Sequence, residues 1–304
     1  MGTAVGVNAF LSVGEESTFG TAVSVSDHFR LIDESVKVED GYNLRQYLSS
    51  SVARTKIRNK RNVTGGFNIP ASYGGIGLLL KHVLGDVSTS GAGPYTHTIT
   101  DGTLPTGLSV QVDRDTAGVG GSSAYKFAGA QVQSLTIKQG MEEEAQIGCE
   151  LLAKTVTNVA AASPSYPSAV YADWLDVSTV TFDGTTFTAR ELEVQISNEL
   201  RADGYKLGDR ERQHLGRKGG GVTMKFGGDY DKLDFFTDYI AGTTGTAVVT
   251  WTDGTNSLSV SLANACIQDG NPNAGDADDI TYDLQLEGDL GDVTVTLINS
   301  DASY

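Results

Sequence analysis

Apolar and polar residues alternate with a period of two along much of this 304-residue chain, and that period limits its fold more than any other feature. A strand turns successive side chains to opposite faces, so each run places one face on a core and the other in water, as in antiparallel sheets. Glycine is frequent, with 37 residues, and proline is rare, with 6, which favours turns and bulges between strands. The sequence therefore predicts a mostly β chain folded as sandwiches or barrels. The alternating runs are 108–112, 132–137, 147–151, 192–196, 258–262, 280–286 and 293–297.

Two short segments show helical spacing instead. Each carries apolar residues on one face of a 3.6-residue period, and a glycine follows each, Gly85 in the first case and Gly242 in the second. We therefore expect one short helix in each half of the chain. The apolar positions are Ile76, Leu79, Leu80 and Val83 in the first helix and Leu233, Phe236, Tyr239 and Ile240 in the second.

The two halves resemble each other, which indicates an internal duplication. A shift of 157 residues lays Gly85 on Gly242 and Lys60-Arg61 on Arg217-Lys218. With a few residues of slippage, 63–67 meets 219–223 and 108–110 meets 258–260. We expect two tandem β-sandwich or barrel domains, residues 1–158 and 169–304, each with one short helix and a long basic loop or hairpin. The small residues and X-Pro dipeptides of 159–168 predict a linker between them.

Positive charge is concentrated in two corresponding windows, although the chain as a whole has a net charge of −16. The windows hold 12 of the 22 Lys and Arg residues, and the first contains no acid. We interpret them as two basic arms that project from an acidic body and contact an acidic surface of another copy; nucleic-acid contact and a simple solvated loop are the alternatives. The predicted stacking residues are Arg45, Arg54, Lys56, Arg58, Lys60 and Arg61 in the first arm and Arg201, Lys206, Arg210, Arg212, Arg217 and Lys218 in the second.

The outward faces of two alternating strands suggest a second surface. Glu150 lies in one run, and Asp283, Gln285 and Glu287 lie in another. On a single molecule these residues form only a solvated face. In a ring with these strands on the inside, they would form a negatively charged inner surface. We predict these four residues to face a lumen.

No motif for catalysis, a cofactor or a membrane span stands out. The four histidines have no ligand partner at metal spacing, no G-x-S-x-G motif occurs, and Gly118–Gly121 and Gly219–Gly221 lack the P-loop Lys-Ser/Thr. The acidic stretch 269–279 approaches an EF-hand loop but lacks its turn glycine and final Glu, so we expect a hairpin tip there. Neither a signal peptide nor an 18-residue apolar window is evident, and Cys149 and Cys266 read as small buried thiols of a reducing compartment. We expect no enzyme, no cofactor and no metal.

Several turn and strand patterns, taken in order, resemble the tail tube (major tail) proteins of long-tailed bacteriophages. They are Val13–Thr21, Ser35–Val38, Gly65–Phe67, the helix ending at Gly85, Gly93–Ile99 and Gly129–Ile137. The resemblance implies β-sandwich-like barrels with one flanking helix and a long loop, whose inner sheets line a tube and whose loop reaches between stacked rings. It implies six domains around the lumen, hence three duplicated chains per ring. A hexamer with an outer decoration domain stays open.

The resemblance also implies a location and partners. We expect a virion tail protein made in the bacterial host cytoplasm, contacting other copies of itself, the tape-measure protein, viral DNA, and the tail terminator and distal tail proteins, without a membrane. An acidic lumen would repel phosphates during DNA ejection, and a sheathless tail is expected from the family alone. The alternatives are a carbohydrate- or host-binding β-sandwich, for which Trp174 and Trp251 offer no aromatic cluster, and a hydrolase, which lacks an assembled nucleophile and base.

Overall fold

The computed structural model describes residues 6–48, 54–115, 123–166, 170–273 and 280–304, and in these ranges the chain is mostly β. Its ladders are antiparallel, as the period-two alternation predicts. All seven predicted runs lie in strands, apart from Ile280 directly before β21. In the same ranges, no helix has the length and apolar character that crossing a bilayer requires.

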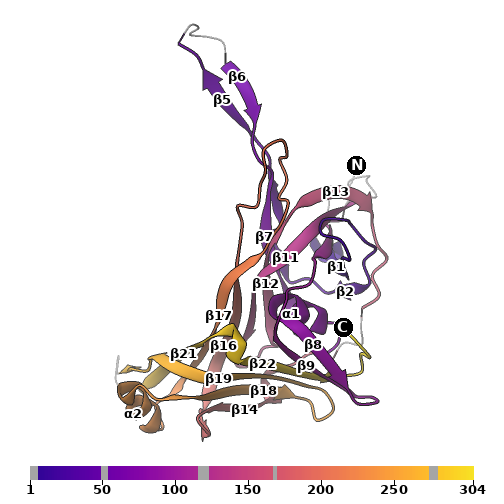
Figure 1. Cartoon of the computed structure of the whole chain (residues 1–304). Coiled ribbons are helices and arrows are strands. Elements are labelled where there is room, and N and C mark those ends of the chain that lie inside the picture. The colour runs from indigo at the N-terminus through magenta and orange to yellow at the C-terminus, as the bar shows by residue number, and fades with distance from the viewer. Residues whose placement is uncertain (1–5, 49–53, 116–122, 167–169, 274–279) are drawn as a thin grey trace.

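Within the described residues, the first half contains thirteen strands and one α-helix, most of which Figure 1 labels. They are β1 (Phe10–Glu15), β2 (Asp27–Phe29), β3 (Asp33–Glu34), β4 (Lys37–Glu39), β5 (Tyr42–Gln46), β6 (Arg54–Arg58), β7 (Asn62–Pro70), α1 (Gly77–Leu84), β8 (Gly85–Ser90), β9 (Tyr95–Asp101), β10 (Leu108–Asp113), β11 (Ser123–Gln139), β12 (Gln146–Ala153) and β13 (Thr155–Ala160).

The second half contains nine strands and the other helix. They are β14 (Val177–Phe182), β15 (Thr185–Thr186), β16 (Ala189–Leu200), β17 (Arg217–Asp229), α2 (Asp234–Ala241), β18 (Thr244–Thr252), β19 (Ser257–Asp269), β20 (Pro272–Asn273), β21 (Thr281–Gly288) and β22 (Val293–Asn299). The two α-helices have the same length and are offset by the 157 residues that the sequence comparison gave.

Seven strand pairings recur in the same chain order in both halves. In the first half β1 pairs with β2 and β10, β11 pairs with β10, β12 and β13, and β7 pairs with β12 and with β3–β4. In the second half β14 pairs with β15 and β18, β19 pairs with β18, β21 and β22, and β17 pairs with β21 and β16. One detail of the sequence match was wrong: 258–260 lies in β19, which corresponds to β11, whereas 108–110 lies in β10.

The halves are joined edge to edge, because β11 also pairs with β16. Three strands from each half thereby form one continuous sheet in the order β7–β12–β11–β16–β17–β21. Directly opposite residues make rows that cross all six strands. One fully buried row is Ile69, Ile147, Ile137, Val194, Met224 and Leu286, and the adjacent row on the other face is Asn68, Gly148, Thr136, Gln195, Thr223 and Glu287.

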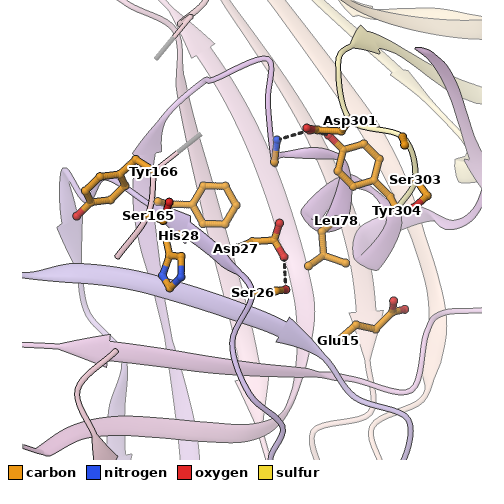
Figure 2. Close-up of a pocket in the computed structure, with 13 residues that line it drawn as sticks. Glu15, Ser26, Asp27, His28, Leu78, Ser165, Tyr166, Asp301, Ser303 and Tyr304 are labelled. Atoms are coloured by element: carbon orange, nitrogen blue, oxygen red, sulfur yellow. Dashed lines mark hydrogen bonds between the residues drawn. The ribbon is translucent and has the colours of Figure 1, made fainter. Parts of the chain in front are cut away.

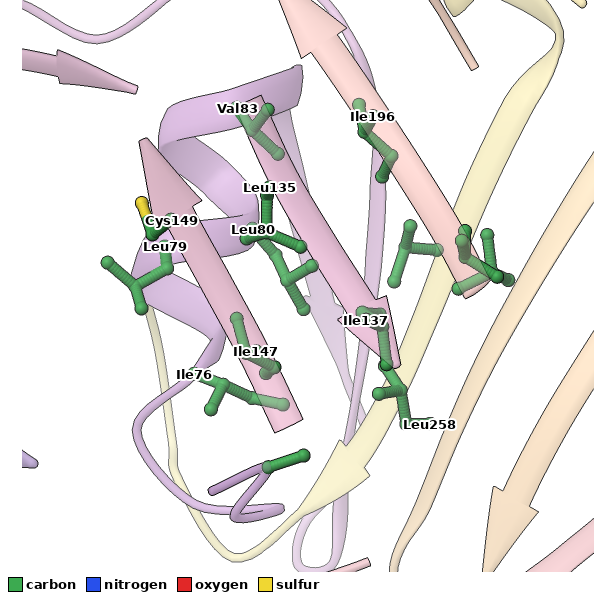
Figure 3. Close-up of a cluster of buried hydrophobic side chains, with 14 of the residues drawn as sticks. Ile76, Leu79, Leu80, Val83, Leu135, Ile137, Ile147, Cys149, Ile196 and Leu258 are labelled. Carbon is green, nitrogen blue, oxygen red and sulfur yellow. The ribbon is translucent and has the colours of Figure 1, made fainter. Parts of the chain in front are cut away.

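The main hydrophobic core extends through both halves, which differs from two separate domain cores. Helix α1 lies on the apolar face of the sheet where the halves meet, and its side chains approach Leu135 of β11 and Ile196 of β16 (Figure 3). The predicted face of α1 is confirmed, since Ile76, Leu79 and Val83 are buried in that core with Leu80.

Helix α2 ends before Gly242 as predicted, but its predicted apolar face was wrong. The buried side chain is Phe235, whereas Leu233 and Ile240 are exposed. Gly242 adopts the left-handed conformation that ends the helix.

The segment between the halves is bound to the first half on both sides of residues 167–169, which lie outside the described residues. β13 takes in the first two residues of the predicted linker 159–168 and pairs with β11. Further on, Ala172 donates to the carbonyl of Ala71, and Ala145 donates to that of Ala172. Backbone hydrogen bonds therefore hold the start of the second half against the first.

Candidate assembly surfaces

β5 and β6 form a hairpin that extends beyond the body of the molecule and pairs with no other described strand (Figure 1). Every residue of the two strands is exposed. Their alternation leaves apolar side chains in water, because Tyr42, Leu44 and Ile57 have no core beneath them. An isolated two-stranded hairpin is marginally stable in water, so this element has the surface of one that packs against something outside the chain.

One face of the hairpin combines apolar and cationic groups. Tyr42 lies opposite Arg58, Leu44 opposite Lys56, and Gln46 opposite Arg54, so these side chains share one face. The guanidinium carbon of Arg58 lies 5.7 Å from the centre of the Tyr42 ring. The face would suit an acidic partner surface that also offers apolar contact.

The second predicted arm does not project, which corrects the expectation of two projecting arms. Residues 201–216 fold against the base of the hairpin, where the Arg61 amide donates to the Arg210 carbonyl at 2.8 Å and the Tyr205 hydroxyl donates to the Arg61 carbonyl at 2.8 Å. The Arg61 guanidinium also donates to Glu211 at 2.8 Å, and Asp40 accepts from both Arg61 and Arg210. The second arm is therefore a brace for the first, and we call residues 201–216 the brace.

Arg212 shows why the brace cannot swing out freely. Its side chain is buried, with 2 % exposure, and donates to the carbonyls of Val63 at 3.0 Å, Ala153 at 2.8 Å and Ala202 at 3.1 Å, and to the Asn62 side chain. Burial lowers the pKa of Arg212. Because these bonds consume its donors inside the chain, Arg212 is not available to another ring.

The other predicted stacking residues fall into two groups. Arg217 is half-buried, donates to the Gly102 carbonyl at 2.8 Å and forms an ion pair with Asp101 at 2.5 Å, so it too is engaged within the chain. The remaining group is exposed and free to meet another molecule. It comprises Arg45, Arg54, Lys56 and Arg58 on the hairpin, Lys60 at its base, whose Nζ lies 4.8 Å from the centre of the Tyr205 ring, Arg201 and Lys206 within the brace, and Lys218 just after it.

The structure brings all four predicted lumen residues to the polar face of the six-stranded sheet. Glu150 lies on β12, and Asp283, Gln285 and Glu287 lie on β21, at the other end of the sheet. Gly66 on β7 makes room for this arrangement, since a Cβ there would lie 2.6 Å from Oε1 of Glu150. The face is thus smooth and hydrophilic over both halves.

Two lysines interrupt the acids on that face. Lys138 Nζ lies 2.9 Å and Lys225 Nζ 3.5 Å from the Glu193 carboxylate, on the three central strands. The hydrogen bond from Lys138, with the charge of both lysines, lowers the pKa of Glu193 despite partial burial. At neutral pH the centre of the face carries this ionised cluster, and its ends carry unpaired acids such as Glu150 and Asp283.

A cavity of about 510 Å³ lies between β2, α1 and the last residues of the chain (Figure 2). Glu15, Asp27 and Asp301 line it together with Tyr166 and Tyr304. His28 also borders it, but its Nδ1 is hydrogen-bonded at 2.6 Å to Ser12, which is fully buried. That serine cannot reach a substrate, so this pair has a structural role.

The other histidines have separate environments. His97 is buried and satisfied, with Nδ1 2.8 Å from the Thr89 hydroxyl and Nε2 3.1 Å from the Asn299 side chain. His82 is buried on α1 with Nε2 3.6 Å from Glu15, and burial lowers its pKa. In the described part of the chain, no three His, Cys, Asp or Glu side chains gather as a metal site. The glycine-rich tip 118–121 and residues 274–279 of the acidic stretch lie outside the described residues.

Sequence reasoning missed three features of these surfaces. Asp40 ties the hairpin to the brace, and its signal was the acidic pair Glu39-Asp40 a few residues before the cationic window. The apolar residues of the hairpin alternate like a core strand, although they are exposed in the described part of the chain. The outward-facing stripe of α2 was read as a core-facing one.

Comparison with known proteins supplies the family. A family model described as "Phage tail tube protein" matches residues 6–289, nearly the whole chain. The chain belongs to the phage tail tube protein family. As a tail tube protein it is a structural component of the phage tail that assembles into a tube. A search among curated proteins found no match.

Proposed function

We propose that this tail tube protein polymerises as stacked rings of three chains, in which two repeated units per chain give pseudo-sixfold symmetry around a DNA-conducting lumen. The observation that carries the proposal is the six-stranded sheet with one polar face over both halves. The recurrence of seven strand pairings supports the division into two equivalent units, near residues 1–158 and 169–304.

The same sheet favours three chains over a hexamer with an outer decoration domain. A decoration domain would not need to continue the inner sheet, whereas β16, β17 and β21 extend it from β11 with the same polar row. A carbohydrate-binding sandwich has no support here, because Trp251 is fully buried and cannot join an exposed aromatic cluster with Trp174.

The polar face would line the lumen. Acids such as Glu150 and Asp283 repel the phosphate backbone, so DNA would meet few adhesive sites during ejection. Lys138 and Lys225 share the single Glu193 carboxylate, so this cluster keeps one positive charge, fewer than the three negative charges of Glu150, Asp283 and Glu287 on the same face. Before ejection the lumen would hold the tape-measure protein, and the ends of the tube would meet the tail terminator and distal tail proteins.

The hairpin would make the axial contact between rings. Its exposed cations Arg54, Lys56 and Arg58 lie on one face with Tyr42 and Leu44, and the rest of the chain is strongly acidic. Charge complementarity steers association and sets its register. Of the predicted stacking residues, we assign this role to those on the hairpin.

Electron microscopy of purified protein tests the proposal. We expect tubes with a regular axial repeat from the wild type, and folded protein without tubes from the triple variant Arg54→Glu, Lys56→Glu and Arg58→Glu. The matched control, Arg201→Glu, Lys206→Glu and Lys218→Glu, changes the charge equally at exposed positions within the brace and just after it, and should still form tubes. Normal tubes from the hairpin variant would refute the axial role.

A further inference from the structure

The two helices occupy equivalent places in their units but differ in how they are covered. Ile76 and Val83 on α1 have 1 % and 0 % exposure, whereas their counterparts 157 residues later, Leu233 and Ile240 on α2, have 62 % and 69 %. With Phe236, which is partly buried, Leu233 and Ile240 make an apolar stripe along one side of α2. We call these three residues the α2 stripe.

The cover over α1 comes partly from the other half of the chain. α1 packs on its own β11 and β9 and also reaches β16, whose Ile196 lies opposite Leu135 of β11 (Figure 3). The hairpin β8–β9 covers α1 as well and has no counterpart after α2. The cover over α1 therefore combines strands of its own half with β16 of the other half.

At the equivalent junction beside α2, no described strand takes the place of β16. β19 corresponds to β11, and through the β21 pairing Ile267 takes the place of Leu135. Leu135 is fully buried and Ile267 only partly. The strands equivalent to β16 are β3 and β4, which lie at the opposite end of the same sheet and pair on one side only, with β7.

We propose that the α2 stripe is buried by the β3–β4 end of a second copy, so that β19 of one chain meets β3–β4 of the next as β11 meets β16 within the chain. A surface at one end of the sheet then meets a different surface at the other end, a head-to-tail contact that closes into a ring. This inference rests on the proposed function and supplies the residues of its lateral contact.

The intramolecular junction also gives the register of the proposed contact. Thr136 lies opposite Gln195. The equivalent positions are Ser35, between β3 and β4, and Gln268–Asp269 on β19, where the strand has a bulge and Asp269 lies opposite Gln285. In the single chain the Val36 carbonyl accepts from Arg114, and the Val36 amide donates to Glu34. Such capping keeps an edge strand from pairing prematurely, and it must open before Val36 itself can pair.

Cross-linking tests the register. In a Cys266→Ser background, the double variant Ser35→Cys and Gln268→Cys carries two exposed thiols at opposite ends of the sheet. Treating assembled tubes with a short bis-maleimide should give covalent dimers and trimers on a denaturing gel, ending at trimers if three chains close the ring. Each single-cysteine variant is the control and should stay monomeric. Tubes that form normally but do not cross-link would overturn this inference and leave the proposed function intact, whereas the absence of tubes from the wild type would refute the proposed function itself.

The stripe itself is tested by Ile240→Asp against Ile240→Leu. Because Ile240 is exposed in the single chain, both variants should melt within a degree or two of the wild type. The Asp variant should raise the protein concentration needed for tube growth at least about tenfold, since burying an isoleucine-sized side chain is worth more than that factor. The Leu variant should assemble like the wild type. Equal assembly of the Asp variant would overturn the role of the stripe.

Discussion

The two basic windows of the chain hold equal numbers of cations, but their side chains have different environments in the structure. In residues 45–61 most cations stand on an exposed hairpin, whereas in 201–218 the central arginines turn inward to carbonyls and carboxylates of the first half. The difference follows from the other residues that each window contains. The first has no acid, while the second contains Asp203, Asp209 and Glu211 and a buried Arg212. A charge cluster in a sequence therefore does not tell whether the charge is offered to a partner or used to hold the fold.

The largest expected difference between the two windows concerns stability. Arg212→Ala removes a buried cation that serves three carbonyls, so it should lower the free energy of unfolding by about 3 kcal/mol. Lys56→Ala on the exposed hairpin should change it by less than about 0.5 kcal/mol. Urea denaturation followed by circular dichroism measures both. If the two variants lost similar stability, the contrast between brace and hairpin would be broken.

A smaller effect is expected where the two windows meet. Arg61→Ala removes the contacts to Asp40 and Glu211 and should cost about 1 kcal/mol. Arg58→Ala is the matched control, because Arg58 Nη2 lies 3.9 Å from Asp40 and is more exposed. Faster amide hydrogen exchange in the brace of the Arg61 variant, and not of the Arg58 variant, would support a specific tie. Equal exchange in both variants would show that Arg61 does not hold the brace.

The smallest expected effect is a dependence on acid. Partial desolvation acts to raise the pKa of Asp40, but the hydrogen bond and charge of Arg210, with those of Arg61 and Arg58, outweigh it and lower the pKa below 3.8. A lowered folded pKa means that the contribution to stability is complete above pH 3.8 and disappears as the pH falls through the folded value. Below the folded pKa of Asp40, the amide hydrogens of the brace should exchange faster, after correction for their intrinsic exchange rates. Asp40→Asn should abolish this change, and its persistence in that variant would assign the effect to another group.

Much of the fold followed from local pattern. Alternation found the long strands because a strand with one buried face must repeat every two residues, and the helical spacing with Gly85 and Gly242 found both helices. What the pattern left undetermined was which long-range surface each apolar face meets. The stripe of α2 looks like a core face because it has the same physical character, although Leu233 and Ile240 are largely exposed among the described residues of one chain.

The candidate site was predictable in its chemistry and not in its geometry. Glu150, Asp283, Gln285 and Glu287 were placed on wetted faces by alternation alone, and the pairing of β11 with β16 is what makes those faces continuous. That pairing depends on a partner strand some sixty residues away along the chain, which single-sequence periodicity does not specify. The inward turn of Arg212 likewise depends on carbonyls of β7 and β12 that carry no side-chain signal.

The single projecting hairpin has a mechanical consequence. If each chain supplies two units around the ring and one hairpin along the axis, axial ties are half as numerous as lateral ones. When the tube bends, the strain would then concentrate at the few contacts between successive rings, while each ring keeps its circular cross-section. A filament made this way would flex by tilting stiff discs against one another, and its bore would stay open on the inside of the curve.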